Sequence, residues 1–154
     1  MSVNPRTPAG RALEKGYQCA ITMAGAPDIE LYEREVQPFG MDVGEKIDIT
    51  TQHNQDIRTF AIPALPEVTD GQTVCGYDPA ILVKILARVG KNDKLTYHFP
   101  NGDTWVVDGG LKSFVPNAMS QTAMPEATAM FIHTGVDSSV SEGDELKPVY
   151  TPSA

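Results

Sequence analysis

Residues 47–60 read IDITTQHNQDIRTF, and residues 94–116 read KLTYHFPNGDTWVVDGGLKSFVP. The first stretch has apolar residues at both ends and a polar centre, which is typical of two strands joined by a long turn. In the second, apolar and polar residues alternate on both sides of Asn101-Gly102, a pair typical of tight hairpin turns. Both patterns predict antiparallel strands, and neither contains a catalytic constellation.

Further strands are predicted outward from these two stretches. Alternation in YQCAITM predicts a strand over residues 17–23, and similar patterns predict strands over residues 29–36, 72–75, 111–115 and 127–133. The pair Gly109-Gly110 predicts a bulge or a bend before residue 111. The predicted fold class is therefore mainly β, as a sandwich or barrel.

A single helix is predicted over residues 78–89. Asp78 suits the N-cap, Pro79 the first helical position, and Gly90 the end of the helix. A lone amphipathic helix in a strand-rich chain is expected to lie flat on the sheet, with Lys84 and Arg88 facing water. Its apolar stripe is predicted to belong to the core and consists of Ile81, Leu82, Ile85, Leu86 and Val89.

The chain divides into a domain and two arms. Residues 1–16 have no hydrophobic period and are predicted to be an N-terminal arm. Residues 17–136 are predicted to form the β domain, and residues 137–154 a polar C-terminal arm that is extended or mobile until it finds a partner. A long loop at about residues 45–60 is predicted to leave the domain. Ordered loops of this length usually carry function.

Charge and composition limit the function. The 154 residues carry a net charge of −8, and eight acidic against two basic residues leave residues 28–56 at −6. A protein that holds nucleic acid needs the opposite sign, so the segment is either a solvated acidic face or a surface that DNA passes without adhering. No run is apolar and long enough for a spanning helix or a secretory signal, which favours a cytosolic protein. Cys19 and Cys75 are expected to be separate, buried thiols.

No residue pattern predicts an enzyme, a cofactor or a metal. His53, His98 and His133 lack metal-site spacing, no nucleophile elbow is present, and Gly109-Gly110 does not open a helix that could hold phosphate. Asp103 and Asp108 flank Trp105 and could serve as paired carboxylates around a sugar platform. Turn chemistry at Asp103 and core packing of Trp105 are the preferred explanation.

The order of these elements resembles the tail tube proteins of long-tailed bacteriophages, in particular the non-contractile, lambda-like siphophages. The resemblance covers residues 17–136 and rests on the stretch Asp48-Ile-Thr-Thr51 with Arg58 and Phe60, the helix at 78–89, the hairpin Phe99-Pro-Asn-Gly102, and the last strand before Thr134-Gly135. Their order and spacing carry the resemblance, since each piece alone is common.

The resemblance implies a hexameric ring in which strands of neighbouring copies join one continuous inner barrel. Stacked rings would form a hollow virion tail, assembled in the host cytoplasm, that houses a tape-measure protein, meets tail-terminator and tail-tip proteins, and later conducts DNA. It also implies that terminal arms lock the rings together and that the long loop reaches a neighbouring subunit. The loop residues predicted to make this contact are Thr50, Thr51, Gln52, His53, Asn54, Gln55, Asp56 and Arg58.

Three alternatives remain open from the sequence. The chain could be the tube protein of a contractile tail, a bacteriocin, a gene transfer agent or a type VI secretion system. It could be a head-decoration or tail-completion protein that does not polymerise. It could also be a small hydrolase or sugar-binding domain that uses Trp105, Asp103 and Asp108.

Overall fold

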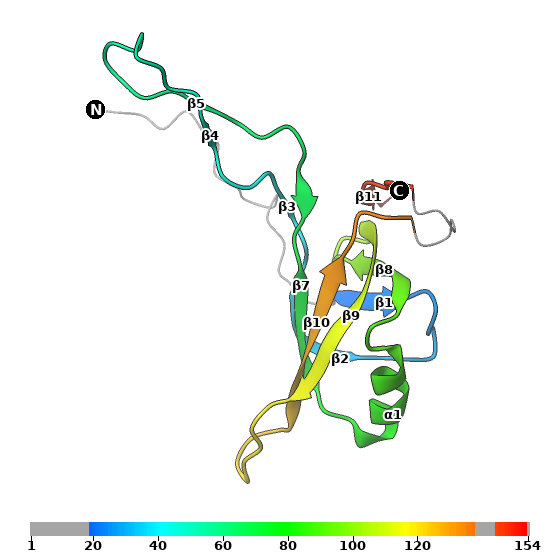
Figure 1. The fold of residues 1–154 in the computed structure, drawn as a ribbon. Coiled ribbons are helices and arrows are strands. Elements are labelled where there is room, and N and C mark those ends of the chain that lie inside the picture. Colours follow the sequence, from blue (N-terminus) through cyan, green and yellow to red (C-terminus); the bar gives the residue numbers. More distant parts are fainter. Residues whose placement is uncertain (1–18, 138–143, 154) are drawn as a thin grey trace, which may run out of the picture.

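The computed structural model describes residues 19–137 and 144–153, and most of them belong to one antiparallel sheet. The sheet has seven strands in the order β1-β8-β9-β10-β7-β2, and β11 pairs with the beginning of β9 (Figure 1). Its strands are β1 (Ala20–Met23), β2 (Tyr32–Gln37), β7 (Gly71–Gly76), β8 (Asn92–His98), β9 (Thr104–Pro116), β10 (Glu126–His133) and β11 (Val149–Thr151).

Two small ribbons and one helix complete the described part of the chain. β3 (Met41–Asp42) pairs with β6 (Glu67–Val68), and β4 (Ile47–Asp48) pairs with β5 (Phe60–Ala61). The helix α1 spans Pro79–Arg88. The predicted mainly β class with one helix is confirmed, because the sheet curls into a half-barrel with α1 at its side. The sequence-predicted long hairpin is also present, as the β4–β5 ribbon.

The core lies inside the curl of the sheet. Alternate residues of β8 are buried, as the sequence predicted, so that Leu95 and Tyr97 point inward. The β8–β9 turn closes through a hydrogen bond from the Phe99 amide to the Asp103 carbonyl (2.9 Å), with Gly102 at a φ of 93° that favours glycine. The largest fully buried apolar side chains are Tyr97, Phe131, Ile85 and Leu95.

Strand β9 is one continuous element where a break was predicted. The predicted separate strand at 111–115 is its second half, and the bulge lies at Lys112, between the pairs Met130–Ser113 and Phe131–Leu111. Gly109 has a different role, since a Cβ there would lie 2.0 Å from the Ile132 carbonyl oxygen. The glycine therefore permits close strand packing without interrupting β9.

The residues at the two ends of α1 explain where the helix begins and ends. The Asp78 carboxylate accepts a hydrogen bond from the Ala80 amide (2.9 Å), so Asp78 is the N-cap, and Pro79 is the first helical residue. At the other end Val89 is extended, and Gly90 has a φ of 83°. The Gly90 amide then donates to the Leu111 carbonyl (2.9 Å), which attaches the end of the helix to β9.

Only part of the predicted apolar stripe of α1 reaches the core. Ile85 is buried, and Ile81 and Leu82 are half-buried against the core, whereas Leu86 is 51% exposed and Val89 is 36% exposed. The prediction that Leu86 and Val89 are core residues is wrong for this chain. Each residue turns the helix by about 100°, so Leu86 points well away from Ile85. Val89 lies beyond the last helical turn, in the extended cap.

The prediction that Lys84 and Arg88 both face water is correct only for Lys84. The Lys84 ammonium lies in solvent, 3.2 Å from the Asp28 carboxylate. The Arg88 side chain is only 21% exposed and donates to the Asp93 carboxylate (2.8 Å), which also accepts from the Gly25 amide (2.7 Å). This network ties the end of α1 to β8 and to the turn after β1.

The two predicted arms have different outcomes. The predicted N-terminal arm, residues 1–16, lies outside the described residues. In the C-terminal segment, β11 pairs with β9 of its own chain, so residues 149–151 are ordered without a partner, contrary to the prediction. The Asp103 side chain explains this order, since it accepts hydrogen bonds from the Tyr150 hydroxyl and from the Ser153 amide (2.6 Å).

Candidate functional site

The most prominent feature outside the sheet is a projecting ribbon formed by residues 41–68, hereafter the arm. It leaves the sheet between β2 and β7 and extends far from the half-barrel, with β3–β6 at its base and β4–β5 further out (Figure 1). The β4–β5 ladder has only two residue pairs, Ile47 with Ala61 and Asp48 with Phe60. An isolated ribbon of this kind is marginally stable in water unless another surface covers it.

The arm exposes apolar side chains that the rest of the described residues do not cover. Every large apolar residue between positions 41 and 65 is exposed, and Ile57, Ile62 and Leu65 reach 75–84% exposure. Contiguous exposed apolar surface rimmed by polar residues marks interaction sites. The set consists of Met41, Val43, Ile47, Ile49, Ile57, Phe60, Ile62 and Leu65.

The tip of the arm is held in shape by its own polar side chains. Asn54 accepts from the Thr51 amide (3.0 Å) and donates to the Ile57 carbonyl (3.0 Å) and to the Thr59 hydroxyl (3.2 Å). The amide of Thr59 donates to the Thr50 hydroxyl (2.9 Å). The Thr50 amide donates to the Asp48 carboxylate (2.9 Å), and this hydrogen bond lowers the pKa of Asp48. The tip is therefore preorganised, although it has no apolar core.

The residues predicted for the inter-subunit contact all lie on this tip. Thr51, Gln52, His53, Gln55, Asp56 and Arg58 are exposed, while Thr50 and Asn54 are half-buried within the turn. The part of the arm outside this tip is hereafter called the stem. The sequence prediction overlooked the apolar residues of the stem as candidate contacts. Their signal was present as apolar positions on both sides of the polar centre, but those positions were used only to predict the two strands.

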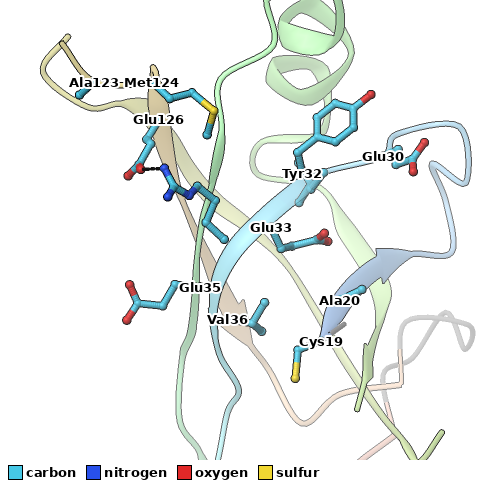
Figure 2. A pocket seen from close by; sticks show the side chains of 12 residues that line it. Cys19, Ala20, Glu30, Tyr32, Glu33, Glu35, Val36, Ala123, Met124 and Glu126 are labelled. Atoms are coloured by element: carbon cyan, nitrogen blue, oxygen red, sulfur yellow. Dashed lines mark hydrogen bonds and ion pairs between the residues drawn. The ribbon is translucent and has the colours of Figure 1, made fainter. Parts of the chain in front are cut away.

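The second candidate surface is a groove along the seam where the curled sheet comes closest to closing. The seam lies between the two edge strands, β1 and β2, with the β9–β10 connection at one end (Figure 2). The groove is open and measures about 1500 Å³. It is lined by Cys19, Ala20, Glu30, Leu31, Tyr32, Glu33, Arg34, Glu35, Val36, Ala123, Met124 and Glu126.

Glu33 of β2 reaches across this seam. Its carboxylate accepts a hydrogen bond from the Ile21 amide of β1 (3.2 Å). Burial raises the pKa of Glu33, and the hydrogen bonds from the Glu33 and Ile21 amides only partly offset the effect. Arg34 is the bulged residue of β2 and pairs with the Glu126 carboxylate of β10. Within residues 19–137, the Glu33 side chain thus joins β2 to β1, and the two strands form no ladder of backbone hydrogen bonds.

The residues considered for an enzyme or sugar-binding site have structural roles. The Asp103 carboxylate anchors the C-terminal strand, and the hydrogen bond from the Tyr150 hydroxyl lowers its pKa. Trp105 packs its ring against Phe39, with centroids 4.0 Å apart. Asp108 is buried within β9. The three side chains are engaged in the fold.

The histidines and cysteines are also separate from one another. His133 is buried: its Nδ1 donates to the Thr69 carbonyl (2.7 Å), so Nε2 accepts from the Tyr97 hydroxyl (3.1 Å). Burial lowers the pKa of His133 and raises that of Tyr97. Burial raises the pKa of the Cys75 thiol to about 11, while Cys19 is half-buried at the seam. In the described ranges, no three His, Cys, Asp or Glu side chains gather as metal ligands.

A similar fold occurs in a symmetric assembly. The chain aligns with one chain of the cryo-EM structure of the anti-feeding prophage (AFP) baseplate, 6-fold symmetrised, with a TM-score of 0.55. The alignment covers 75% of this chain and 87% of that chain at 8% sequence identity. No family model and no curated protein matches the sequence. At this identity the likeness concerns the fold, on which many functions can be built.

No helix in residues 19–137 or 144–153 is both long and apolar enough to cross a membrane.

Proposed function

We propose that this protein is a structural, non-enzymatic ring subunit of a phage-type tail, and specifically the tail tube subunit. Six copies would form a ring, and stacked rings would form a hollow tube in the virion tail. The tape-measure protein would fill the lumen, and tail-terminator and tail-tip proteins would cover its ends. The observation that carries the proposal is the arm, because eight large apolar side chains between residues 41 and 65 are exposed in the part of the chain that the structure describes.

Burial of the arm on a neighbouring copy supplies the driving force for assembly. Apolar surface transferred from water to an interface contributes about 25 cal/mol per Å² before the cost of association. The preorganised tip lowers that cost, since its hydrogen bonds already fix the turn around Asn54. The tip and stem therefore act together, the stem through buried area and the tip through shape and polar contacts.

Two further observations support a ring. A similar fold is found in a six-fold symmetrised baseplate structure. The sheet also ends in two edge strands, β1 and β2, and exposed edges invite pairing with another chain unless they are covered.

The net charge of −8 suits a conduit through which DNA passes without adhering.

The likeness to a baseplate chain favours a second candidate, a ring subunit at the base of a tail. Such a subunit would use the same arm and edges but would form a single ring without stacking indefinitely. Tubes of variable length distinguish the tube subunit from the baseplate subunit. Tubes of a contractile tail, a bacteriocin, a gene transfer agent or a secretion system share this expectation and differ in their partner proteins.

Substitution on the stem of the arm tests the proposal. Ile62→Asp should leave the monomer folded, because Ile62 is 80% exposed, and should prevent ring formation in sedimentation velocity runs. Val83→Asp is the matched control, since Val83 is 78% exposed on the outer side of α1. Normal assembly of Ile62→Asp, or equal loss in both variants, would count against the arm as the assembly interface.

A further inference from the structure

The arm joins the sheet through two short segments that are bonded to each other. Phe39-Gly40 leads from β2 into β3, and Thr69-Asp70 leads from β6 into β7 (Figure 1). The Gly40 amide donates to the Thr69 hydroxyl (2.7 Å), and the Thr69 amide donates to the Gly40 carbonyl (2.8 Å). The contacts that hold these two segments on the sheet therefore set the direction in which the arm projects.

His133, the last residue of β10, contacts both segments. Its Nδ1 donates to the Thr69 carbonyl (2.7 Å), and its ring packs on the buried Phe39 ring, with centroids 4.8 Å apart. Phe39 in turn packs on Tyr97 and Trp105, with centroids 5.3 Å and 4.0 Å away. The base of the arm is thus fixed to β10 by one hydrogen bond and by a cluster of rings.

The contact with Thr69 and Tyr97 requires a neutral imidazole. Nδ1 carries the proton that it donates to Thr69, so Nε2 accepts from the buried Tyr97 hydroxyl (3.1 Å). Among the described residues, His133 is the hydrogen-bond partner of that hydroxyl. A second ring proton would place two donors opposite each other, and the Tyr97 hydroxyl could accept only by leaving its own proton without an acceptor.

The surroundings disfavour a charged imidazole. A Cβ on Gly71 would overlap the Tyr97 hydroxyl oxygen and lie 3.2 Å from His133 Cε1, so β7 packs directly against the pair. Burial lowers the pKa of His133, and the Thr69 carbonyl and the Asp70 carboxylate offset this only in part. The stability from the neutral ring is therefore present above pH 6.5 and is lost as the pH falls through the folded pKa.

Solvent reaches His133 through an open groove beside the base of the arm. The other charged residues that line this groove are Glu67 of β6, Glu145 and Lys147. On β9, Asp108 is next to Gly109, the ladder partner of His133, and strand alternation directs the Asp108 side chain to the opposite face. On β8, Tyr97 keeps its proton at neutral and acidic pH, because burial raises its pKa.

We propose that His133 is a pH-dependent latch for the arm: the neutral imidazole fixes the base of the arm to the sheet, and a second ring proton releases it. The proposal rests on the proposed function in one respect, since it makes ring assembly depend on a fixed arm. The released state keeps the sheet, because the β8–β9 and β9–β10 ladders do not involve the arm. Assembly should therefore weaken in mildly acidic solution.

Amide hydrogen exchange of the dilute, unassembled protein tests the latch without assembly. Between pH 7.5 and pH 5.0, after correction for the intrinsic pH dependence of exchange, the protection of the Gly40 and Thr69 amides should fall about tenfold more than that of β8 and β9. His133→Gln, which cannot gain the ring proton, should show no such difference. His53→Gln in the tip of the arm and His98→Gln at the end of β8 are the controls and should behave as the wild type.

Tyr97→Phe is the second variant and decides the matter if His133→Gln does not fold. It removes the hydroxyl that donates to Nε2, so protonation of His133 becomes easier and the base of the arm should be released at a higher pH than in the wild type. A purely structural role of His133 predicts no such shift. A midpoint of release that is unchanged or lower in Tyr97→Phe would overturn the latch.

The outcomes separate the latch from the proposed function. An equal loss of protection throughout the sheet, or a pH effect that persists in His133→Gln, overturns the latch and leaves the tail function intact. Release at the base of the arm in a protein that forms no rings at any pH supports the latch and contradicts the tail function. Rings that form equally well at pH 5.0 and pH 7.5, although the base of the arm is released at pH 5.0, overturn the link between the latch and assembly.

Discussion

Ile85 is the residue through which α1 is fixed to the sheet. It is the one fully buried side chain of the helix, while the adjacent Leu86 is 51% exposed. Ile85→Ala should lower the free energy of unfolding by about 2–5 kcal/mol, because it removes buried methyl groups and leaves a cavity. Leu86→Ala, the matched control, should change it by less than about 0.5 kcal/mol.

Urea unfolding followed by the fluorescence of the single tryptophan, Trp105, measures both variants, since that ring packs on Phe39 in the core. Equal losses for Ile85→Ala and Leu86→Ala would mean that the helix is rotated relative to the arrangement described above.

The ionisation of Glu33 makes stability depend on pH. Burial in the seam raises its pKa above the ordinary 4.5, so the charged form opposes folding at neutral pH, and this cost disappears as the pH falls through the folded pKa. Glu33→Gln keeps an oxygen for the Ile21 amide without the charge. It should raise the melting temperature at pH 7, and the gain should vanish at pH 4.5 and below.

Glu35→Gln is the control for this measurement, since Glu35 is exposed on the same strand and should show no such pH-dependent gain. A difference in melting temperature between Glu33→Gln and the wild type that stays constant from pH 4 to pH 8 would show that the Glu33 charge does not cause it.

At the scale of residues, the sequence predicted local chemistry well and side-chain burial less well. The N-cap Asp78 and the turn at Asn101-Gly102 depend on neighbouring residues only, and both are confirmed. Leu86 and Arg88 were assigned to the wrong environments, because burial depends on how α1 is rotated on the sheet. That rotation is set by contacts outside the helix, with Asp93 of β8 and with Leu111 of β9.

Among the elements, β11 is held by its pairing with β9 and by the Asp103 carboxylate. Asp103 accepts from the Tyr150 hydroxyl and the Ser153 amide, and these hydrogen bonds lower its pKa below the ordinary 3.8. Asp103→Ala should therefore release residues 149–151 from β9 and speed amide hydrogen exchange there, without unfolding the rest of the sheet.

Tyr150→Phe removes one of the two hydrogen bonds and should give an intermediate exchange rate. Because the pKa of Asp103 is lowered, its contribution should be present above pH 3.8 and lost as the pH falls through the folded pKa. Asp56→Asn, in the exposed tip of the arm, is the control. Unchanged exchange in Asp103→Ala would show that backbone pairing alone holds β11.

The tip of the arm is the element whose deletion separates folding from assembly. Removal of residues 50–56 should leave a folded monomer with an unchanged melting temperature, because none of these residues belongs to the buried core. The same deletion should stop polymerisation, as measured by light scattering. Normal tubes from the deletion variant would contradict an inter-subunit role for the tip.

The strands could be predicted from the periodicity of apolar residues. Whether another part of the molecule packs against their apolar face could not. Strand alternation indicated β8, β9 and the β4–β5 ribbon, each within a few residues of its observed bounds. The apolar positions Ile47 and Ile49 helped to predict the ribbon, and both residues are 52% exposed. Periodicity reports that one face is apolar, and it does not say whether the covering surface belongs to the same chain.

For the whole molecule, the arrangement of edges matters more than any single contact. Within the described residues the sheet curls so that β1 and β2 approach one another, and the hydrogen bond between Glu33 and the Ile21 amide joins them without strand pairing. Together with the arm, this leaves two surfaces that another copy could complete. The mainly β class followed from the sequence, while the open seam did not, because closure depends on strand order across the entire sheet.

The proposed function also belongs to this scale, since rings and tubes are properties of many copies. Negative-stain electron microscopy of the concentrated protein, before and after salt is added to screen its net charge of −8, tests the central claim most directly. We predict hollow tubes or stacked rings with sixfold end views. A discrete oligomer that never stacks, at any concentration or salt, would contradict the tube and favour a decoration, completion or single-ring protein.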